Sequence, residues 1–379
     1  MPTRIAPGVE EAKTMAAPKT TIWPADPHTL AKHALLRGYL EAWFPILARH
    51  QGRLIYYDGF AGPGRYQDGQ EGSPLVALDV ALRHRKRLNC ELVFVFVEED
   101  LERARWLEQV ELPRVNRPDN FKVQVLKQRF EDALRSTLDA LDAQGLEIAP
   151  TFAFVDPFGL KGLPFPLIER LLQRRSCEVL VTFMTRDVNR FVIELPEHVA
   201  DLIGNPSAPD AIRRAPDGAS EARRLYESSL RRTARFVRTF RMKDERSALI
   251  YDLFFATNHP LGHARMKEAM WKVDRSGAFS FSDGLNPDQT VLFTPNPEVD
   301  LGPRLWGHFR GRVVDTAEVY RHALDETVYL QKHALAALRL LEVGSCPGAG
   351  RIEVEALKRD GTKRRPRTFP EGTIVRFVE

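Results

Sequence analysis

The chain has 379 residues, of which 43% are hydrophobic and 28% are charged, and its formal net charge is +4. This composition is ordinary for a soluble globular protein of two or three domains, and the small net charge alone does not indicate a polyanionic partner. No apolar run approaches the roughly 18 residues of a membrane span, and the N-terminal MPTRIAPGVEEAKTM carries charges where a secretory signal is apolar. We therefore expect a cytoplasmic protein that makes no membrane contact.

The cysteines are too scattered to form a metal site or a disulfide framework. Cys90, Cys177 and Cys346 lie far apart and show no CxxC or Cys/His spacing. Reduced thiols fit a cytoplasmic location, and we expect no bound metal ion.

The chain begins with a predicted tail and a predicted helix. Residues 1–27 are rich in Pro, Ala and Thr, which predicts a flexible tail. From His33 to Ala48 apolar residues recur at helical spacing, which predicts an amphipathic helix.

Short apolar strands then alternate with helical sequences. The predicted strands are LIYYD, ELVFVFVEE, FKVQVL, TFAFVD and EVLVTFM, at 54–58, 91–99, 121–126, 151–156 and 178–184. Strands that are apolar on both faces and alternate with helices predict a parallel sheet covered on both sides.

The next segment completes this predicted domain. Residues 185–233 are expected to be a helical insertion, and the β-rich runs 234–242 and 248–259 flank a polar turn. An antiparallel pair after five strand–helix units is the layout of class I methyltransferases. The sequence therefore predicts an α/β fold with a Rossmann-like, doubly wound sheet over 28–275.

The C-terminal part differs in composition. Residues 276–312 are rich in Gly, Pro, Asp and Asn, which predicts a linker. Residues 313–379 contain two helical sequences followed by two β-rich runs around a basic turn, which predicts a winged-helix-like domain.

The stretch DGFAGPG at 58–64 directly follows the first predicted strand. Glycines let the backbone adopt positive φ and let a ligand lie against it, and open α/β sheets bind ligands at this edge. The acid precedes the glycines and GxGxxG is absent, which favours a cationic or amino-acid-bearing ligand over a dinucleotide. The alternative is a tight strand–helix turn without a ligand.

This stretch resembles the D-x-F-A-G-x-G form of motif I in S-adenosylmethionine-dependent nucleic-acid methyltransferases, whose loop lies against the methionine part of the cofactor. The resemblance implies that S-adenosyl-L-methionine is the cofactor. The predicted cofactor-binding residues of the loop are Asp58, Gly59, Phe60, Ala61, Gly62 and Gly64.

Two residues at the ends of other strands extend the predicted cofactor site. Glu98 follows the second apolar run, where a carboxylate can accept hydrogen bonds from ribose hydroxyls. Glu99 and Asp100 instead suit the start of the next helix. Gln128, after the third strand, either meets the adenine ring or is an exposed residue at a helix start.

The stretch FAFVDPFGLKG at 152–162 closes the fourth predicted strand with Asp156. It resembles motif IV of amino-methyltransferases, usually (D/N/S)-P-P-(Y/F/W), in which the first side chain and a neighbouring carbonyl accept the two hydrogens of an exocyclic amine. The resemblance implies catalytic roles for Asp156, Pro157 and Phe158, mainly in positioning the amine.

This stretch also departs from the motif. The aromatic residue comes third, Gly159 takes the stacking position, and the DPFG form is similar to one in tRNA guanine-N2 methyltransferases. The departure leaves open which residue stacks on a base. The alternative is that Asp156 only caps the next helix.

Several stretches together resemble one family, the three-Cys-motif partner proteins (TcmP). They are KHALLRGYLEAWFPIL, YYDGFAGPGRY, GSPLVAL, FVEED, FAFVDPFG and NHPLG with MKEAMWKVD. The likeness extends from about residue 30 to the end of the chain, and its most specific parts are DGFAGPGRY followed by GSP, and DPFG. The family name refers to cysteines of a neighbouring protein, so the resemblance implies a three-Cys-motif protein as a partner.

These observations predict an S-adenosylmethionine-dependent methyltransferase that acts on an exocyclic amine of a nucleic-acid base. The alternative is a non-catalytic methyltransferase-like module that docks another protein. A dinucleotide-dependent reductase is disfavoured by the absence of GxGxxG.

Two basic stretches are candidate nucleic-acid contacts. Residues 213–246 hold eleven Lys or Arg against five Asp or Glu, and KRDGTKRRPR at 358–367 holds six against one. The residues we select are Arg224, Arg231 and Arg235, which share a face if 219–235 is one helix, and Lys363, Arg364 and Arg365 in the basic turn. The alternative for both stretches is a solvated charged surface.

Overall fold

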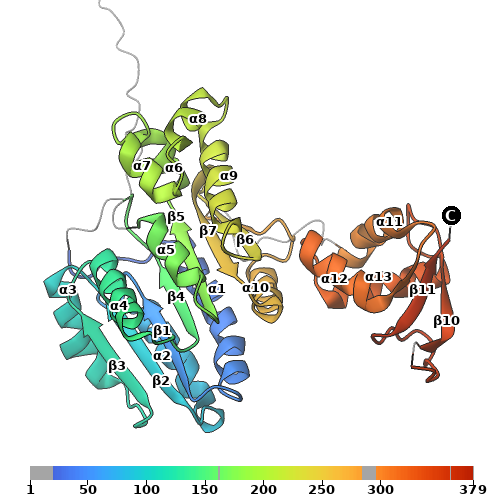
Figure 1. Ribbon diagram of the computed structural model, residues 1–379, viewed down its shortest axis with the longest axis horizontal. Helices are drawn as coiled ribbons and strands as arrows, with labels where there is room; N and C mark the ends of the chain where they lie inside the picture. The colour runs from blue at the N-terminus through green and yellow to red at the C-terminus, as the bar shows by residue number, and fades with distance from the viewer. Residues whose placement is uncertain (1–19, 161–162, 284–295, 359, 379) are drawn as a thin grey trace, which may run out of the picture.

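The computed structural model describes residues 20–160, 163–283, 296–358 and 360–378 (Figure 1). Within these residues the strands form an eight-stranded sheet of order β3-β2-β1-β4-β5-β7-β6-β8 and a separate three-stranded sheet. The strands of the larger sheet are β1 (Arg53–Asp58), β2 (Glu91–Val97), β3 (Phe121–Leu126), β4 (Thr151–Val155), β5 (Cys177–Phe183), β6 (Phe236–Lys243), β7 (Leu249–Thr257) and β8 (Ser280–Ser282).

Strand directions in the larger sheet define the fold. β1 pairs in parallel with β2 and β4, β2 with β3, and β4 with β5, whereas β7 runs antiparallel to both β5 and β6. This strand order confirms the predicted α/β fold with a Rossmann-like, doubly wound sheet of the class I methyltransferase layout. The chain order reverses between β1 and β4, where open sheets of this kind bind their ligands.

Helices cover both faces of this sheet (Figure 1). On one face α1 (Pro27–Leu47) contacts both α2 (Ser73–His84) and α10 (Pro260–Val273), and on the other α4 (Phe130–Gln144) packs on α5 (Phe165–Leu172). A short α3 (Leu101–Trp106) follows β2. β4 and β5 are buried along their whole length, as strands between two helical layers must be.

The first helix starts earlier than its apolar pattern predicts. α1 begins at Pro27, a residue type favoured at the first helical position, rather than near His33. The buried face of α1 includes His28 and Lys32, so polar side chains extend it beyond the apolar repeat.

The segment before α1 also differs from the prediction of a flexible tail over 1–27. Residues 1–19 lie outside the described residues. Residues 20–26 pack on the loop after β1, where the carbonyl of Trp23 accepts the N–H of Gln67 at 2.9 Å.

The long stretch between β5 and β6 is helical, as expected for 185–233. Its helices are α6 (Thr185–Phe191), α7 (Pro196–Ile203), α8 (Ala208–Arg214) and α9 (Gly218–Arg231).

The stretch predicted as a linker, 276–312, contains regular structure. β8 pairs in parallel with β6 and extends the larger sheet. α11 (Pro297–Phe309) packs on α13 (Gln331–Val343) and so belongs with the C-terminal unit. Neither element was predictable from composition. β8 is only three residues long, and α11 contains Pro303, a residue type that usually ends a helix.

The C-terminal unit combines three helices with a small antiparallel sheet. After α11 come β9 (Val313–Asp315), α12 (Thr316–Glu326), α13, β10 (Ile352–Lys358) and β11 (Thr373–Phe377). The strands pair in the order β10-β11-β9. Its two consecutive helices followed by a hairpin have the order predicted for 313–379.

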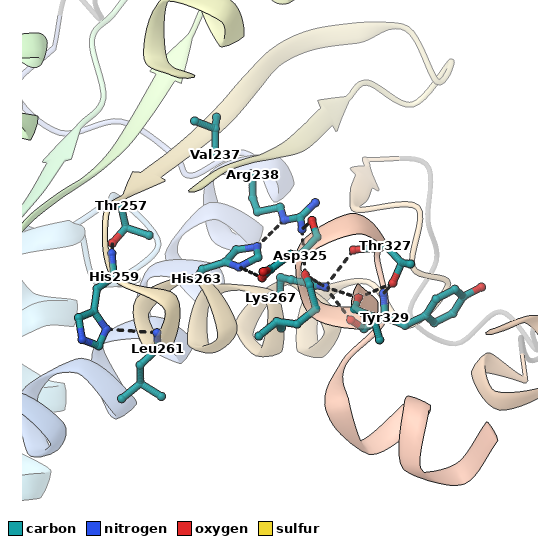
Figure 2. Close-up of polar contacts among 12 residues, drawn as sticks. Val237, Arg238, Thr257, His259, Leu261, His263, Lys267, Asp325, Thr327 and Tyr329 are labelled. Carbon is teal, nitrogen blue, oxygen red and sulfur yellow. Dashed lines mark hydrogen bonds and ion pairs between the residues drawn. The ribbon is translucent and has the colours of Figure 1, made fainter. Parts of the chain in front are cut away.

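The C-terminal unit docks on α10 through the end of α12 (Figure 2). Nζ of the fully buried Lys267 donates to the carbonyls of Leu324, Thr327 and Tyr329, at 2.6, 2.9 and 2.6 Å. Arg238 also donates to the Leu324 carbonyl, at 2.9 Å. The last carbonyls of a helix lack intrahelical donors, so the N–H groups of Lys267 and Arg238 satisfy them. Burial lowers the pKa of Lys267 to about 6, so hydrogen bonding rather than charge is its main contribution.

Figure 2 also shows structural roles for the two histidines of this region. Nδ1 of His259 accepts the N–H of Leu261 at 3.2 Å and caps α10. The ring of His263 stacks on Phe236 with 4.6 Å between ring centroids, and its Nε2 accepts the Nε–H of Arg238 at 2.6 Å.

Lys267→Met keeps the length of the side chain and removes its ammonium group. We expect it to lower the free energy of unfolding by about 2–4 kcal/mol, because buried carbonyls at the end of α12 lose their donor. Thermal denaturation and hydrogen exchange of the α12 amides measure the loss. Lys272→Met is the control on the same helix, since the side chain of Lys272 is 64% exposed. Equal effects of the two substitutions would contradict a role of Lys267 in docking.

Candidate functional site

The loop after β1 is tied to the ends of both neighbouring strands. The N–H of Gly59 donates to the carbonyl of Phe154 on β4 at 2.8 Å. The N–H of Ala61 donates to the carbonyl of Val97 on β2 at 2.9 Å. These bonds fix the loop across the edge where the strand order reverses.

Each of the three glycines in the loop occupies a position where a side chain would be strained or would clash. Gly62 and Gly64 have φ angles of +63° and +86°, which side chains disfavour. A Cβ on Gly59 would lie 2.5 Å from the ring of Phe130, and one on Gly64 would lie 2.7 Å from Leu107. The protein's own backbone and side chains therefore account for all three glycines.

Asp58 lies beneath the loop. Its fully buried carboxylate accepts the N–H of Phe60 at 3.3 Å and the hydroxyl of Tyr56 at 3.2 Å, and it hydrogen-bonds with Ser73. Burial raises the pKa of this carboxyl to about 7. Asp58 supports the loop from below.

Glu98 joins the loop to the end of β2. Its carboxylate accepts the N–H of Gly62 at 2.8 Å and that of Asp100 at 2.9 Å, and its burial raises the pKa of the carboxyl. Asp100 caps α3 by accepting the N–H groups of Glu102 and Arg103, as expected for a residue at a helix start. A ribose contact by Glu98 would use the lone pairs that the two N–H groups leave free.

Asp156 lies at the end of β4 and is held by two side chains. Its Oδ1 accepts the hydroxyl of Thr182 at 2.6 Å, and its Oδ2 forms an ion pair with Lys32 of α1. The ammonium of Lys32 also lies 5.2 Å from the centroid of the Tyr251 ring. α5 begins at Phe165 after Pro164, so Asp156 does not cap the next helix.

A cavity separates the glycine loop from the end of β4. Its volume is about 30 Å³, far below the several hundred Å³ of a typical ligand pocket. The residues that line it are Trp23, His33, Phe60, Ala61, Gly62, Pro63, Gly64, Arg65, Tyr66, Gly72, Ser73, Asp156 and Phe158.

Trp23 covers the cavity from the segment before α1. Its ring makes edge contacts with Tyr66 and Phe158, at 5.7 and 5.8 Å between centroids, and the guanidinium of Arg103 lies 4.9 Å from it. The Trp23 ring would lie 3.6 Å from a Cβ on Gly62. A larger ligand therefore enters only if Trp23 moves away.

The predicted site residues divide into two groups. Those on the cavity wall are Phe60, Ala61, Gly62, Gly64, Asp156 and Phe158. Those off the wall are Asp58, Gly59, Glu98, Gln128 and Pro157. Gln128 is exposed and Pro157 is buried.

The sequence analysis missed three residues of the site: Trp23, Lys32 and His33. Trp23 stands in the segment interpreted as a tail, and the other two are polar positions within a helix recognised by its apolar residues. The adjacent charged and polar pair Lys32–His33, about three turns before Trp43, was the available signal.

The predicted basic face on α9 is interrupted. α9 ends at Arg231, and Arg235 lies beyond it, with its N–H bonded to Asn258, so the three arginines do not share one helix face. Arg224 pairs with Glu221 and Arg231 with Glu227, both on the same helix.

In the C-terminal basic turn, the side chains of Lys363 and Arg365 are exposed, whereas Arg364 is directed inward. The Arg364 side chain is 9% exposed, donates to Glu342 at 2.6 Å and lies 5.3 Å from the ring of Phe369. The guanidinium of Arg364 therefore holds the hairpin on α13, and its contact with nucleic acid stays a prediction.

The described residues contain no membrane-spanning helix and no cluster of metal ligands. Among them no helix is both long and apolar enough to cross a membrane, and no group of three or more metal-ligating side chains occurs. Cys90, Cys177 and Cys346 are free thiols and are buried.

Comparisons with known proteins found one weak structural similarity. No family model matches the chain, and no curated protein matches it. A solved structure of Trm1 from Pyrococcus horikoshii in complex with S-adenosyl-L-methionine is similar at 12% sequence identity and a TM-score of 0.32, over 70% of this chain and 64% of that one. The fold assignment rests on the strand order and not on this likeness, and the resemblance to TcmP stays a prediction.

Asp58→Asn tests the buried carboxylate under the loop. With a pKa of about 7 in the fold and about 3.9 when unfolded, the native state binds more protons between these values, so stability falls as pH rises through them. We expect Asp58→Asn to remove up to about 1.4 kcal/mol of this fall per pH unit and to be the more stable protein at pH 8. Urea denaturation of both proteins from pH 4 to pH 8 measures it, and identical pH slopes would contradict the assignment.

Proposed function

We propose that the chain is an S-adenosylmethionine-dependent methyltransferase that acts on an exocyclic amine of a nucleic-acid base. The observation that carries the proposal is the presence of Asp156 and the glycine loop on one cavity, at the carboxyl ends of β4 and β1. This is the crevice in which open α/β sheets bind ligands.

The walls of the cavity suit a ligand that carries a cation. Phe60, Tyr66 and Phe158 present aromatic rings, and aromatic faces attract cations such as a sulfonium. The Asp156 carboxylate adds negative charge on the same wall. The glycine loop would hold the cofactor once Trp23 has moved outward, and S-adenosylmethionine supplies an electrophilic methyl group when bound.

The role of Asp156 is to orient the target amine. Thr182 and Lys32 each hold one of its oxygens, so the carboxylate is fixed in direction, and each oxygen keeps a lone pair to accept an amine hydrogen. Orienting the amine lone pair towards the methyl group lowers the barrier through positioning. Phe158 is half-buried beside Asp156, and we propose that it is the residue of this loop that contacts a base.

The C-terminal unit would contact the nucleic-acid backbone as a winged-helix-like domain. Its two consecutive helices and β10–β11 hairpin support that proposal, and in such domains the hairpin touches phosphates. The β-bridge between Leu357 and Lys363 prolongs the hairpin, and successive side chains along it alternate in direction. Lys363 and Arg365 therefore face solvent while Arg364 faces α13.

A second candidate function is a non-catalytic module that keeps this fold to dock another protein. The observation that favours it is the small size of the cavity, in which Trp23 lies over the loop and Lys32 occupies one oxygen of Asp156. Calorimetric titration with S-adenosylhomocysteine separates the two candidates, because a docking module would not bind the nucleoside.

Asp156→Ala tests the proposed chemistry. We expect methyl transfer from labelled S-adenosylmethionine to nucleic acid to fall by at least about 100-fold, because alanine removes the side-chain acceptor that orients the target amine. Calorimetry with S-adenosylhomocysteine on both proteins measures cofactor affinity separately from methyl transfer.

Asp139→Ala, on the exposed face of α4, is the matched control, since the side chain of Asp139 is 59% exposed. Full activity of the Asp156 variant would exclude a catalytic role for this residue.

Lys363→Ala with Arg365→Ala tests the nucleic-acid contact. If both cations neutralise phosphates, the double variant weakens binding of duplexes of any sequence and reduces the slope of log affinity against log salt by about two. Fluorescence anisotropy at several salt concentrations measures the slope. Arg85→Ala with Arg87→Ala, two exposed arginines distant in sequence, is the control, and equal slopes for the two double variants would argue against this surface.

A further inference from the structure

The cavity beside Asp156 has a wall supplied by His33 of α1. The imidazole of His33 is buried, its Nδ1 has no hydrogen-bond partner, and its ring bonds with the backbone of Glu71. Because Nδ1 is unpartnered, the bond to Glu71 comes from Nε2, which carries the ring proton. Nδ1 is therefore a hydrogen-bond acceptor.

Burial keeps this ring uncharged. It lowers the pKa of His33 to about 3, assisted by the charge of neighbouring Lys32, so the imidazole is neutral at physiological pH. A buried acceptor without a donor is rare in native proteins and calls for an explanation.

The other polar groups of the wall are also acceptors or are already paired. Asp156 presents a carboxylate, and Ser73 a hydroxyl that also hydrogen-bonds with Asp58. Arg65 reaches the wall, but its guanidinium is bound to Glu111 at 3.1 Å and to the carbonyl of Gly69 at 2.7 Å. The charge of Asp156 is balanced by Lys32, so the wall offers a ligand acceptor atoms and no unpaired donor.

The size of the cavity limits what these acceptors can bind. A volume of about 30 Å³ holds one group of the size of a water molecule. A small group between these acceptors must be a hydrogen-bond donor, because an anion would bring further acceptors to Nδ1 of His33 and the carboxylate of Asp156. A primary amino or ammonium group has this size and these donors.

We propose that this cavity is a subsite for a primary amino group, one hydrogen of which is accepted by Nδ1 of His33 and another by the carboxylate of Asp156. The inference rests on the proposed function, which offers two sources of such a group. One is the α-amino group of the cofactor's methionine part, and the other is the amine of the methyl acceptor.

Two substitutions separate the roles of the two ring nitrogens. His33→Gln places an amide near Nε2, which keeps the bond to Glu71 and removes the acceptor at Nδ1. His33→Asn places its amide near Nδ1 and loses the bond to Glu71. Thermal denaturation shows whether each variant is folded.

Calorimetry with two nucleosides identifies the source of the amine. S-adenosylhomocysteine carries the α-amino group, and 5′-methylthioadenosine lacks the whole amino-acid part. If the cofactor supplies the amine, His33→Gln weakens binding of S-adenosylhomocysteine by about tenfold or more, His33→Asn weakens it less, and 5′-methylthioadenosine binds all proteins equally. If the methyl acceptor supplies it, both nucleosides bind normally and the KM for the acceptor rises about tenfold in His33→Gln.

A folded His33→Gln variant with unchanged nucleoside binding and unchanged kcat/KM overturns the inference and leaves the proposed function standing. If the wild-type protein binds neither nucleoside, the proposed function fails, and the subsite is tested with methylammonium alone. Nitrogen NMR of the His33 ring then decides: a shift of the Nδ1 resonance on titration supports the subsite, and an unchanged resonance rejects it.

Discussion

The ion pair between Lys32 and Asp156 joins the first helix to the end of β4, and the arrangement of the candidate site depends on it. α1 packs on one face of the sheet, whereas Asp156 lies at the carboxyl edge, so this contact brings a helix face to the crevice. With α1 come His33 on the cavity wall and Trp23 over it. The crevice is thus bounded by three parts of the chain: the glycine loop, the end of β4 and the N-terminal helix with its preceding segment.

The strands of the large sheet were predictable because a strand buried on both faces is a continuous run of apolar residues. TFAFVD and EVLVTFM are apolar at nearly every position, and β4 and β5 are buried throughout. The glycine loop and Asp156 were predictable for a related reason, since they occur where such apolar runs stop. Fold class and the position of the crevice follow from those two patterns.

The remaining parts of the site could not be derived in this way, because their residues are defined by partners distant in sequence. Lys32 is buried only because Asp156, 124 residues later, neutralises it. The ring of Trp23 packs between Tyr66 and Phe158. The Pro- and Ala-rich sequence around Trp23 gives no sign of these distant contacts. Arg364 is one residue of a basic run in the sequence, yet its half-buried partner Glu342 lies on another element. Hydrophobic periodicity predicts which face of a helix is apolar and buried. It does not predict polar residues that are buried because they pair with a distant group.

The docking of the C-terminal unit has a consequence for how this chain can diverge. Lys267 and Arg238 bind main-chain carbonyls at the end of α12. Any amino acid at those positions would supply the same carbonyl groups. Side-chain contacts add to these bonds. Nδ1 of His263 lies 3.6 Å from the Asp325 carboxylate, and the ring centroid of Trp271 lies 6.1 Å from that of Tyr329 and 4.6 Å from that of His333. Side chains of the C-terminal unit that lie away from these contacts are free to change while the attachment persists, so the outer surface of the unit can diverge without loss of its docking.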